Sequence, residues 1–359
     1  MANNKLKFMY FLPYENTIGA DFWIYKGWEN SCNEMGINFK ILLSKDDFFE
    51  KVNTFNPDIL FIQHKFGFRN NDLKKKIKYL NYFIKKKIKI FLAVDWFPEG
   101  PESTSYSDLE IFRNEEIATY FFGEREEDSM SDFVSTTGQD YIKIPNSADK
   151  FYHYPTKKYE KYSFDIVFLG AKLPKKKFFF EEILLPLKKK YKVGIYGPYW
   201  SISDNIKRIG ANISRKIGLN RINEIINSSR ISIPYEDENK LYSSSKICLN
   251  YHEKDTFKTI SSSNHQNETY HKIMNQRSFK IPACGGFQLI DDIDYLRKYY
   301  KDDEMISCKD PKDWFDKIEE FINNHQLREK YARKACEKTH KEHLYENRIN
   351  LILELANKL

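Results

Sequence analysis

Short apolar runs alternate with longer amphipathic stretches along this 359-residue chain. Segments that alternate in this way form parallel β-sheets covered by helices. In the first half, strand-like runs occupy residues 7–12, 38–43, 58–63 and 88–94, helical patterns occupy 22–35 and 73–86, and runs at 116–122 and 140–144 continue the series. The pattern therefore predicts a doubly wound α/β domain.

A second alternating region follows a break at residues 150–161, which are rich in Tyr, Lys and Pro and lack periodicity. Its strand-like runs are 164–169, 192–196, 230–233, 247–250 and 287–290, and its helical patterns are 178–190, 311–323, 326–340 and 345–359. We expect one Rossmann-like domain in 1–155 and another in 156–340, facing a central cleft. The last helix, within 341–359, is expected to cross back towards the first domain.

Net charge and cysteine content exclude few classes of protein. The net charge of +7 suits phosphorylated ligands, anionic membrane surfaces and nucleic acid without choosing among them. The five cysteines are widely spaced and none has zinc-ligand spacing, which favours a reducing, cytoplasmic location. The start lacks a signal-peptide pattern, and no apolar run approaches the roughly 20 residues that span a bilayer. We therefore expect no transmembrane segment, and membrane contact only at the surface.

Residues 275–291 have the pattern of a short helix, a double-glycine stop, a buried strand and an acidic turn. Asn275 is suited to cap the helix, and Gly285 is suited to end it in the left-handed conformation. Arg277 falls in the first turn, where unpaired backbone N–H groups attract anions. We interpret this stretch as a grip for a diphosphate.

Four stretches of the second half together resemble the CgeB-like and related family 1-type glycosyltransferases. They are residues 164–172, 193–200, 233–250 and 275–291, and they follow the order and spacing of that group. In the first half, 144–149 is similar to the segment that ends the acceptor domain of GT-B enzymes, and 95–99 to an acidic turn.

The resemblance implies a GT-B fold, a nucleotide-diphosphate-sugar donor and usually no required metal or other cofactor. It implies a hexosyl- or pentosyltransferase whose acceptor is a hydroxyl of a saccharide or glycoconjugate. The residues that its motifs place at the donor are Gly170, Lys172, Gly197, Tyr235, Ser245, Lys246, Asn250, Asn275, Arg277, Phe279 and Lys280.

Lys280 departs from the pattern of this group. Many retaining relatives carry a Glu there, and its carboxylate accepts hydrogen bonds from the donor ribose. An ammonium group cannot accept them. Either the ribose is held differently, or the donor differs, or activity is lost.

The chemistry of transfer requires fixed positive charge, because the leaving nucleotide diphosphate gains negative charge. Arg277 suits a bidentate phosphate contact, and Lys246 and Lys172 are further candidates. Tyr235 is either a stacking surface for the base or a packing residue in a turn. The serines at 243–245 are either phosphate donors or an ordinary turn before a strand.

An inverting enzyme also needs a general base, usually contributed by the first domain. Asp95 and Glu99 follow the run at 88–94, at its carboxyl end, and are our predicted catalytic residues. Asp21, His64 and Glu124 are rivals. Each carboxylate also has an ordinary explanation as a loop acid or helix cap. A retaining enzyme needs no such base.

A polar segment near the second-half motifs contains His252, His265 and His271, at spacings that do not indicate a zinc site. Its serine-rich part, residues 253–267, is interpreted as a loop over the donor site or a plain surface insertion.

Other functions stay open beside saccharide transfer. A DNA glycosyltransferase acting on a hydroxymethylated base of a viral genome would place the lysine runs at 74–76, 85–87 and 188–190 on phosphates. A catalytically degenerate GT-B binding module would accommodate Lys280. Basic and aromatic residues adjoin at 175–180, which suits either a membrane surface or a helix start whose phenylalanines enter the core.

Overall fold

The computed structural model describes residues 5–12, 20–62, 73–94, 112–252, 254–258, 266–270 and 273–358. The contacts within the chain divide it into two compact units. Unit 1 comprises Met1–Asn146, Thr256–Met274 and Tyr345–Leu359, and unit 2 comprises Ser147–Asp255 and Asn275–Leu344. Among the helices so described, none has the combined length and apolar character that crossing a bilayer requires.

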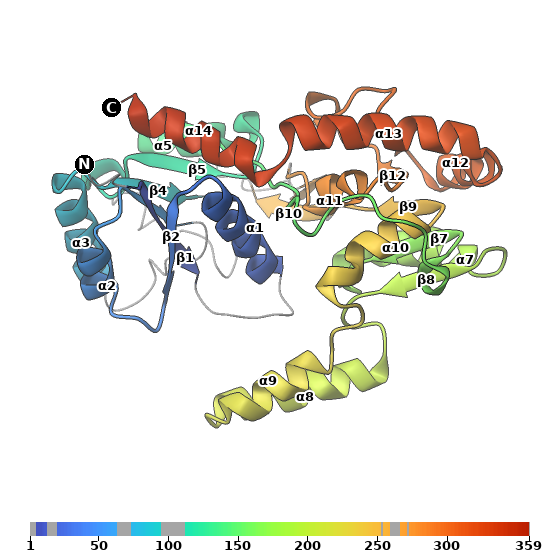
Figure 1. Ribbon diagram of the computed structural model, residues 1–359, viewed down its shortest axis with the longest axis horizontal. Coiled ribbons are helices and arrows are strands. Elements are labelled where there is room, and N and C mark those ends of the chain that lie inside the picture. The colour runs from blue at the N-terminus through green and yellow to red at the C-terminus, as the bar shows by residue number, and fades with distance from the viewer. Residues whose placement is uncertain are drawn as a thin grey trace. The chain divides into compact units, whose positions relative to one another are not determined.

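Unit 1 is built on a six-stranded parallel sheet in the order β2-β1-β3-β4-β5-β6 (Figure 1). The strands are β1 (Lys7–Leu12), β2 (Asn38–Leu43), β3 (Ile59–Ile62), β4 (Lys89–Ala93), β5 (Tyr120–Gly123) and β6 (Tyr141–Lys143). The helices of this unit include α1 (Ala20–Glu34), α2 (Phe48–Phe55), α3 (Leu73–Lys85), α5 (Ser131–Thr137) and α14 (Tyr345–Asn357). The alternation of apolar runs and helices along the first half is therefore confirmed as a parallel α/β sheet.

Successive residues of β1 enter the cores on opposite faces of this sheet, as the two-residue period of a strand requires. Met9 and Phe11 pack with α2 and α3, whereas Phe8 and Tyr10 pack with α1 and α14. The ring of Tyr345, in α14, lies 5.5 Å from that of Trp28 in α1. The C-terminal helix thus belongs to the core of unit 1, as expected.

Unit 2 is built on a five-stranded parallel sheet in the order β13-β12-β9-β7-β8. The strands are β7 (Ile166–Leu169), β8 (Val193–Tyr196), β9 (Ile247–Asn250), β12 (Gln288–Asp291) and β13 (Ile306–Cys308). The helices are α6 (Lys177–Phe179), α7 (Leu185–Leu187), α8 (Ile202–Lys216), α9 (Asn220–Ser228), α10 (Glu238–Ser244), α11 (Arg277–Ala283), α12 (Pro311–Asn323) and α13 (His325–Glu342), and a π-helical turn at Phe180–Leu184 joins α6 to α7.

Two sequence-based expectations need correction, and one open alternative is decided. Residues 230–233 form no strand, because they connect the α8–α9 pair to the sheet, and Ile231 is 40% exposed. The predicted loop at 253–267 contains strand, since β10 (Lys254–Lys258) pairs with β11 (Gln266–Tyr270). The aromatic stretch at 175–180 places Phe179 and Phe180 in the core of unit 2, which removes these two rings from contact with a membrane.

All five cysteines are free thiols. Cys32 is buried in unit 1, Cys248, Cys284 and Cys308 are buried in unit 2, and Cys336 is partly exposed. Burial raises the pKa of each buried thiol above its usual range.

Candidate functional site

The carboxyl edge of the unit 2 sheet brings two glycine-containing loops into contact. Gly170 follows β7 and Gly197 follows β8. A Cβ at Gly197 would lie 2.4 Å from the carbonyl oxygen of Gly170, so the loops touch through bare backbone. Trp200 Nε1 donates to the same carbonyl at 2.7 Å. Lys172 is exposed in the first loop, with Nζ 5.6 Å from the Trp200 ring centroid.

A side chain at Gly197 should disrupt this contact. Gly197 has φ +121°, and the atom that its Cβ would meet belongs to the backbone, which cannot rotate away. We expect Gly197→Ala to lower the free energy of unfolding by about 3 kcal/mol, from backbone strain and overpacking together. Gly218 is the matched control: its φ is +78° but nothing lies within 4 Å, so Gly218→Ala should cost only about 1–2 kcal/mol. Equal losses in urea unfolding would contradict the loop contact.

Arg277 is the first residue of α11, and its guanidinium is fixed at this same edge. Nη1 donates to the carbonyl of Leu169 at 2.8 Å, and Nη2 donates to that of Tyr251 at 3.2 Å. The guanidinium lies 5.3 Å from the Phe168 ring centroid. A Cβ at Gly170 would lie 2.1 Å from Nη1, so the glycine leaves room for the cation. Arg277 therefore stands where β7 and β9 end, which is where parallel sheets bind ligands.

A buried polar network holds the start of α11. Asp291 Oδ1 lies 2.8 Å from His252 Nδ1, and His252 Nε2 accepts the Asn275 backbone N–H at 3.3 Å. Asn250, at the end of β9, accepts a hydrogen bond from Asn275 Nδ2 through its Oδ1 and donates one to Ser278 Oγ through its Nδ2, each at 3.0 Å. Asn275 Oδ1 accepts the Ser278 backbone N–H at 3.2 Å, as a cap requires.

Asp291, His252 and Ser278 are arranged like the catalytic triad of a hydrolase, but all three side chains are buried. Ser278 has no exposed surface, and the ring nitrogen facing it already accepts a backbone N–H. The network therefore positions α11, and Asn250 acts through it. His265 and His271 lie outside the described residues, and within the part of the chain that the structure covers no three metal-binding side chains gather. Gly285 ends α11 with φ +69°, which confirms the predicted stop.

Lys280, on α11, forms a buried ion pair with Glu238, the first residue of α10. Nζ and Oε2 are 3.2 Å apart, and the side chains are 8% and 12% exposed. Nζ also lies 4.6 Å from the Tyr235 ring centroid. His153 Nε2 lies 3.8 Å from the same Oε2. Burial raises the pKa of the Glu238 carboxyl, but Lys280 and His153 lower it more, so the net shift is downward.

His153 gives this cluster a pH dependence. Burial lowers its pKa to about 4, against about 6.5 in an unfolded chain, so the unfolded state binds a proton first as pH falls. The stability that neutral His153 contributes is present above pH 6.5 and is lost as pH falls through about 4. Over that window we expect His153→Gln to remove up to about 3 kcal/mol of the acid-induced decline in unfolding free energy. The exposed His325, changed to Gln, should leave the decline unchanged.

Among the predicted donor residues, Lys246 lies away from the carboxyl edge, and Ser245 and Phe279 are buried. Lys246 precedes β9, and its Nζ lies 2.7 Å from Oδ1 of Asp165, which precedes β7. Both therefore lie at the amino edge, because the residue before a parallel strand sits opposite the strand's end. Ser245 is buried, and its hydroxyl donates to the Leu241 carbonyl at 2.9 Å. Phe279 is fully buried among other rings of the core.

The predicted catalytic acids of the first half are only partly described. Asp95, Glu99 and His64 lie outside the described residues, as does the side chain of Asp21. Glu124 follows β5, at the carboxyl edge of the unit 1 sheet. Its Oε2 accepts a hydrogen bond from Asn146 Nδ2 at 2.6 Å.

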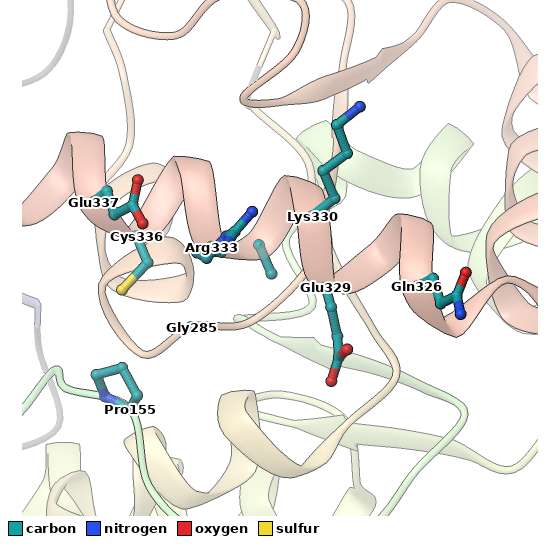
Figure 2. A pocket seen from close by; sticks show the side chains of 9 residues that line it. Pro155, Gly285, Gln326, Glu329, Lys330, Arg333, Cys336 and Glu337 are labelled. Carbon is teal, nitrogen blue, oxygen red and sulfur yellow. The ribbon is translucent and has the colours of Figure 1, made fainter.

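A hollow of about 610 Å³ lies elsewhere in unit 2 (Figure 2). It is lined by Pro155, Gly285 and side chains of α13. Gly285 follows the C-terminal end of α11, whereas Arg277 stands at the other end. The α13 wall carries two cations, Lys330 and Arg333, and two acids, Glu329 and Glu337, so the hollow lacks the positive character of a diphosphate site.

Comparison with known proteins gives the family and the fold of the chain. A family model described as glycosyl transferase-like matches residues 175–354, which is half of the chain. The chain belongs to this glycosyl transferase-like family. The match covers most of unit 2, including Gly197, Arg277 and the Lys280–Glu238 pair, but begins after Gly170. No curated protein sequence matches this glycosyltransferase significantly.

Solved structures that resemble this glycosyltransferase have the GT-B fold. Sucrose-phosphate synthase from Thermosynechococcus elongatus is 9% identical, with a TM-score of 0.59 over 99% of each chain. HepE from Anabaena, in complex with UDP-glucose, is 11% identical, with a TM-score of 0.59 over 99% of this chain and 100% of that one. An α-glucosyltransferase in complex with UDP and DNA is 12% identical, with a TM-score of 0.61 over 98% and 100%. These similarities establish two parallel-sheet α/β domains of the GT-B type.

Proposed function

We propose that this glycosyltransferase uses a uridine diphosphate sugar as donor and binds it at the carboxyl edge of the unit 2 sheet. The observation that carries the proposal is Arg277, whose guanidinium is anchored by two carbonyls beside the touching Gly170 and Gly197 loops. A fixed cation of this kind stabilises the charge that develops on a leaving diphosphate. UDP or UDP-glucose is bound in HepE, which has the same fold. With the charge held by Arg277, we expect transfer to proceed in the presence of a chelator.

The buried ion pair supplies the acid that position 280 lacks. Lys280 stands where the resemblance places a ribose-binding Glu, and Glu238 Oε2 is 3.2 Å from its Nζ. An ionised carboxylate has two oxygens and several acceptor positions, so an ion pair to one oxygen leaves acceptor capacity. We assign the ribose contact to Glu238, held ionised by Lys280.

The acceptor that we propose is a hydroxyl of a saccharide or glycoconjugate, in an enzyme of the CgeB-like group. The cytoplasm suits its five free thiols. A second candidate acceptor is DNA, favoured by the DNA-bound α-glucosyltransferase of the same fold and by the exposed lysines at 188–190. A steep fall of DNA affinity with salt would favour the second candidate.

The donor is tested first by a thermal-shift screen of the full chain against uridine, guanosine, adenosine and cytidine diphosphates and their sugars. A ligand that binds only the folded state raises stability by mass action, by about 2.7 kcal/mol at 100 times its Kd. We expect uridine diphosphate to give the largest shift. A larger shift with another nucleotide would replace the uridine assignment, and no shift with any would favour the degenerate binding module.

A further inference from the structure

Helices α8 and α9 pack together as a hairpin in unit 2 (Figure 1). Isoleucine is frequent among its exposed side chains. Along α8, Ile202, Ile206, Ile209 and Ile213 are 81%, 64%, 55% and 54% exposed. Their spacing of four, three and four residues places them on one helical face. Ile225 of α9 is 62% exposed. Soluble monomers rarely expose so many large apolar side chains on one helical face, so this face is a candidate interaction surface.

Contacts that do not involve the exposed isoleucines stabilise the hairpin. At its base, Asp204 Oδ1 and Arg230 Nε are 2.8 Å apart, and both side chains are largely buried. Between the helices, Asn223 Nδ2 donates to the Ala211 carbonyl at 2.6 Å. Ala211 itself is buried. The helices thus meet through Ala211, Asn223 and Ile226, the last beside Gly210, and the isoleucines of the α8 face stay exposed.

The turn of the hairpin, called its tip below, has exposed apolar side chains with basic side chains beside them. Ile217 and Leu219, in the turn, are 64% and 45% exposed. Three exposed cations adjoin them, Arg215, Lys216 and Arg221. An apolar surface with cations beside it matches the boundary between the acyl chains and the phosphates of an anionic bilayer.

Charge argues against a second copy of this chain as the occupant. Exposed Glu224 is the one acid of α9, and the one acid of α8, Asp204, is already paired with Arg230. Two such hairpins packed face to face with their turns side by side would bring Arg215, Lys216 and Arg221 of both copies together without enough acid to offset them. An anionic lipid surface satisfies both the isoleucines and the cations.

We propose that the α8–α9 hairpin docks this enzyme on the surface of an anionic phospholipid bilayer. The isoleucine face and the tip enter the boundary between head groups and acyl chains, and Arg215, Lys216 and Arg221 lie against lipid phosphates. The hairpin is separate in sequence from Arg277 and from the Lys280–Glu238 pair. The proposal uses none of the residues that the proposed donor site uses.

Co-sedimentation of the full chain with vesicles tests the docking. We expect binding to vesicles of phosphatidylglycerol with phosphatidylcholine and at least about tenfold weaker binding to phosphatidylcholine alone. The triple change Arg215→Gln, Lys216→Gln, Arg221→Gln and the double change Ile209→Gln, Ile213→Gln should each weaken binding about tenfold or more. All five side chains are exposed, so the variants should fold. Lys188→Gln with Lys189→Gln, on another exposed surface of unit 2, is the control and should bind like the wild type.

Light scattering on the same samples measures the oligomeric state. It distinguishes a second copy of the chain from a bilayer as the partner of this face. Failure of the wild type to bind anionic vesicles overturns the proposal. It is also overturned if the isoleucine variant keeps full vesicle binding. A wild-type dimer that the isoleucine variant converts to a monomer, with no vesicle binding, would assign the face to a second copy.

Discussion

Replacing Arg277 by Ala should reduce turnover of the donor sugar by about 100- to 1,000-fold. The guanidinium is held by the carbonyls of Leu169 and Tyr251, so it is already in position before the reaction begins. Its loss removes a preorganised cation from the point where negative charge develops. Arg277→Lys should recover only part of the rate, because one ammonium cannot reproduce a bidentate contact. Initial rates at saturating donor, with UDP affinity by calorimetry, measure the effect.

The matched control for this change is Arg333→Ala, which removes an exposed arginine of unit 2 on α13. It should leave both rate and UDP affinity unchanged. If Arg277→Ala retains wild-type rate while folding normally, the donor phosphate does not meet this residue and the proposed site is wrong.

The second large effect concerns stability at the Lys280–Glu238 pair. Lys280→Met leaves a carboxylate buried at 12% exposure without its ammonium partner. Breaking one side of a buried pair typically costs about 3–5 kcal/mol, most of it from the charge left behind. Lys280→Met combined with Glu238→Gln should recover most of that loss. Urea unfolding of the two single variants and the double variant gives the coupling energy between the two side chains.

Lys246 and Asp165 provide the comparison pair. Their Nζ and Oδ1 are 2.7 Å apart, but the lysine side chain is 49% exposed. Exposed pairs contribute about 0–1 kcal/mol, so Lys246→Met should be nearly neutral. The proposed ribose contact has a separate readout, because Glu238→Gln should weaken UDP binding even where stability is preserved. Unchanged affinity in that variant would assign the pair to stability alone.

Strong local signals predicted the fold of this chain well. The apolar run at 88–94 became β4, and the segment at 38–43 became β2 with the same bounds. The run at 230–233 misled because an Ile-Ser-Ile alternation has the period of a strand, whatever the chain does there. The isoleucines of α8 have the spacing of a helical face. That spacing does not tell whether the face packs on the sheet or, as here, stays exposed.

The site was predictable only where a motif is local. Asn275, Arg277 and Gly285 fall within one short stretch, and in the structure they are a cap, a fixed cation and a helix stop, in that order. The prediction for Lys246 is wrong because Lys246 comes directly before β9. A residue before a parallel strand lies at the amino edge of the sheet, opposite the edge where ligands bind. The partner of Lys280 is 42 residues away along the chain, and no pattern in one sequence joins the two.

The distribution of the thiols makes each unit separately observable. Reagents that modify cysteine react with the thiolate, and burial suppresses both its formation and its access. Unit 1 carries one buried thiol, Cys32, whereas the other three buried thiols belong to unit 2. Pulsed alkylation in rising urea, read by mass spectrometry of the peptides, will therefore record the opening of each unit on its own, with no label or reporter added to the chain.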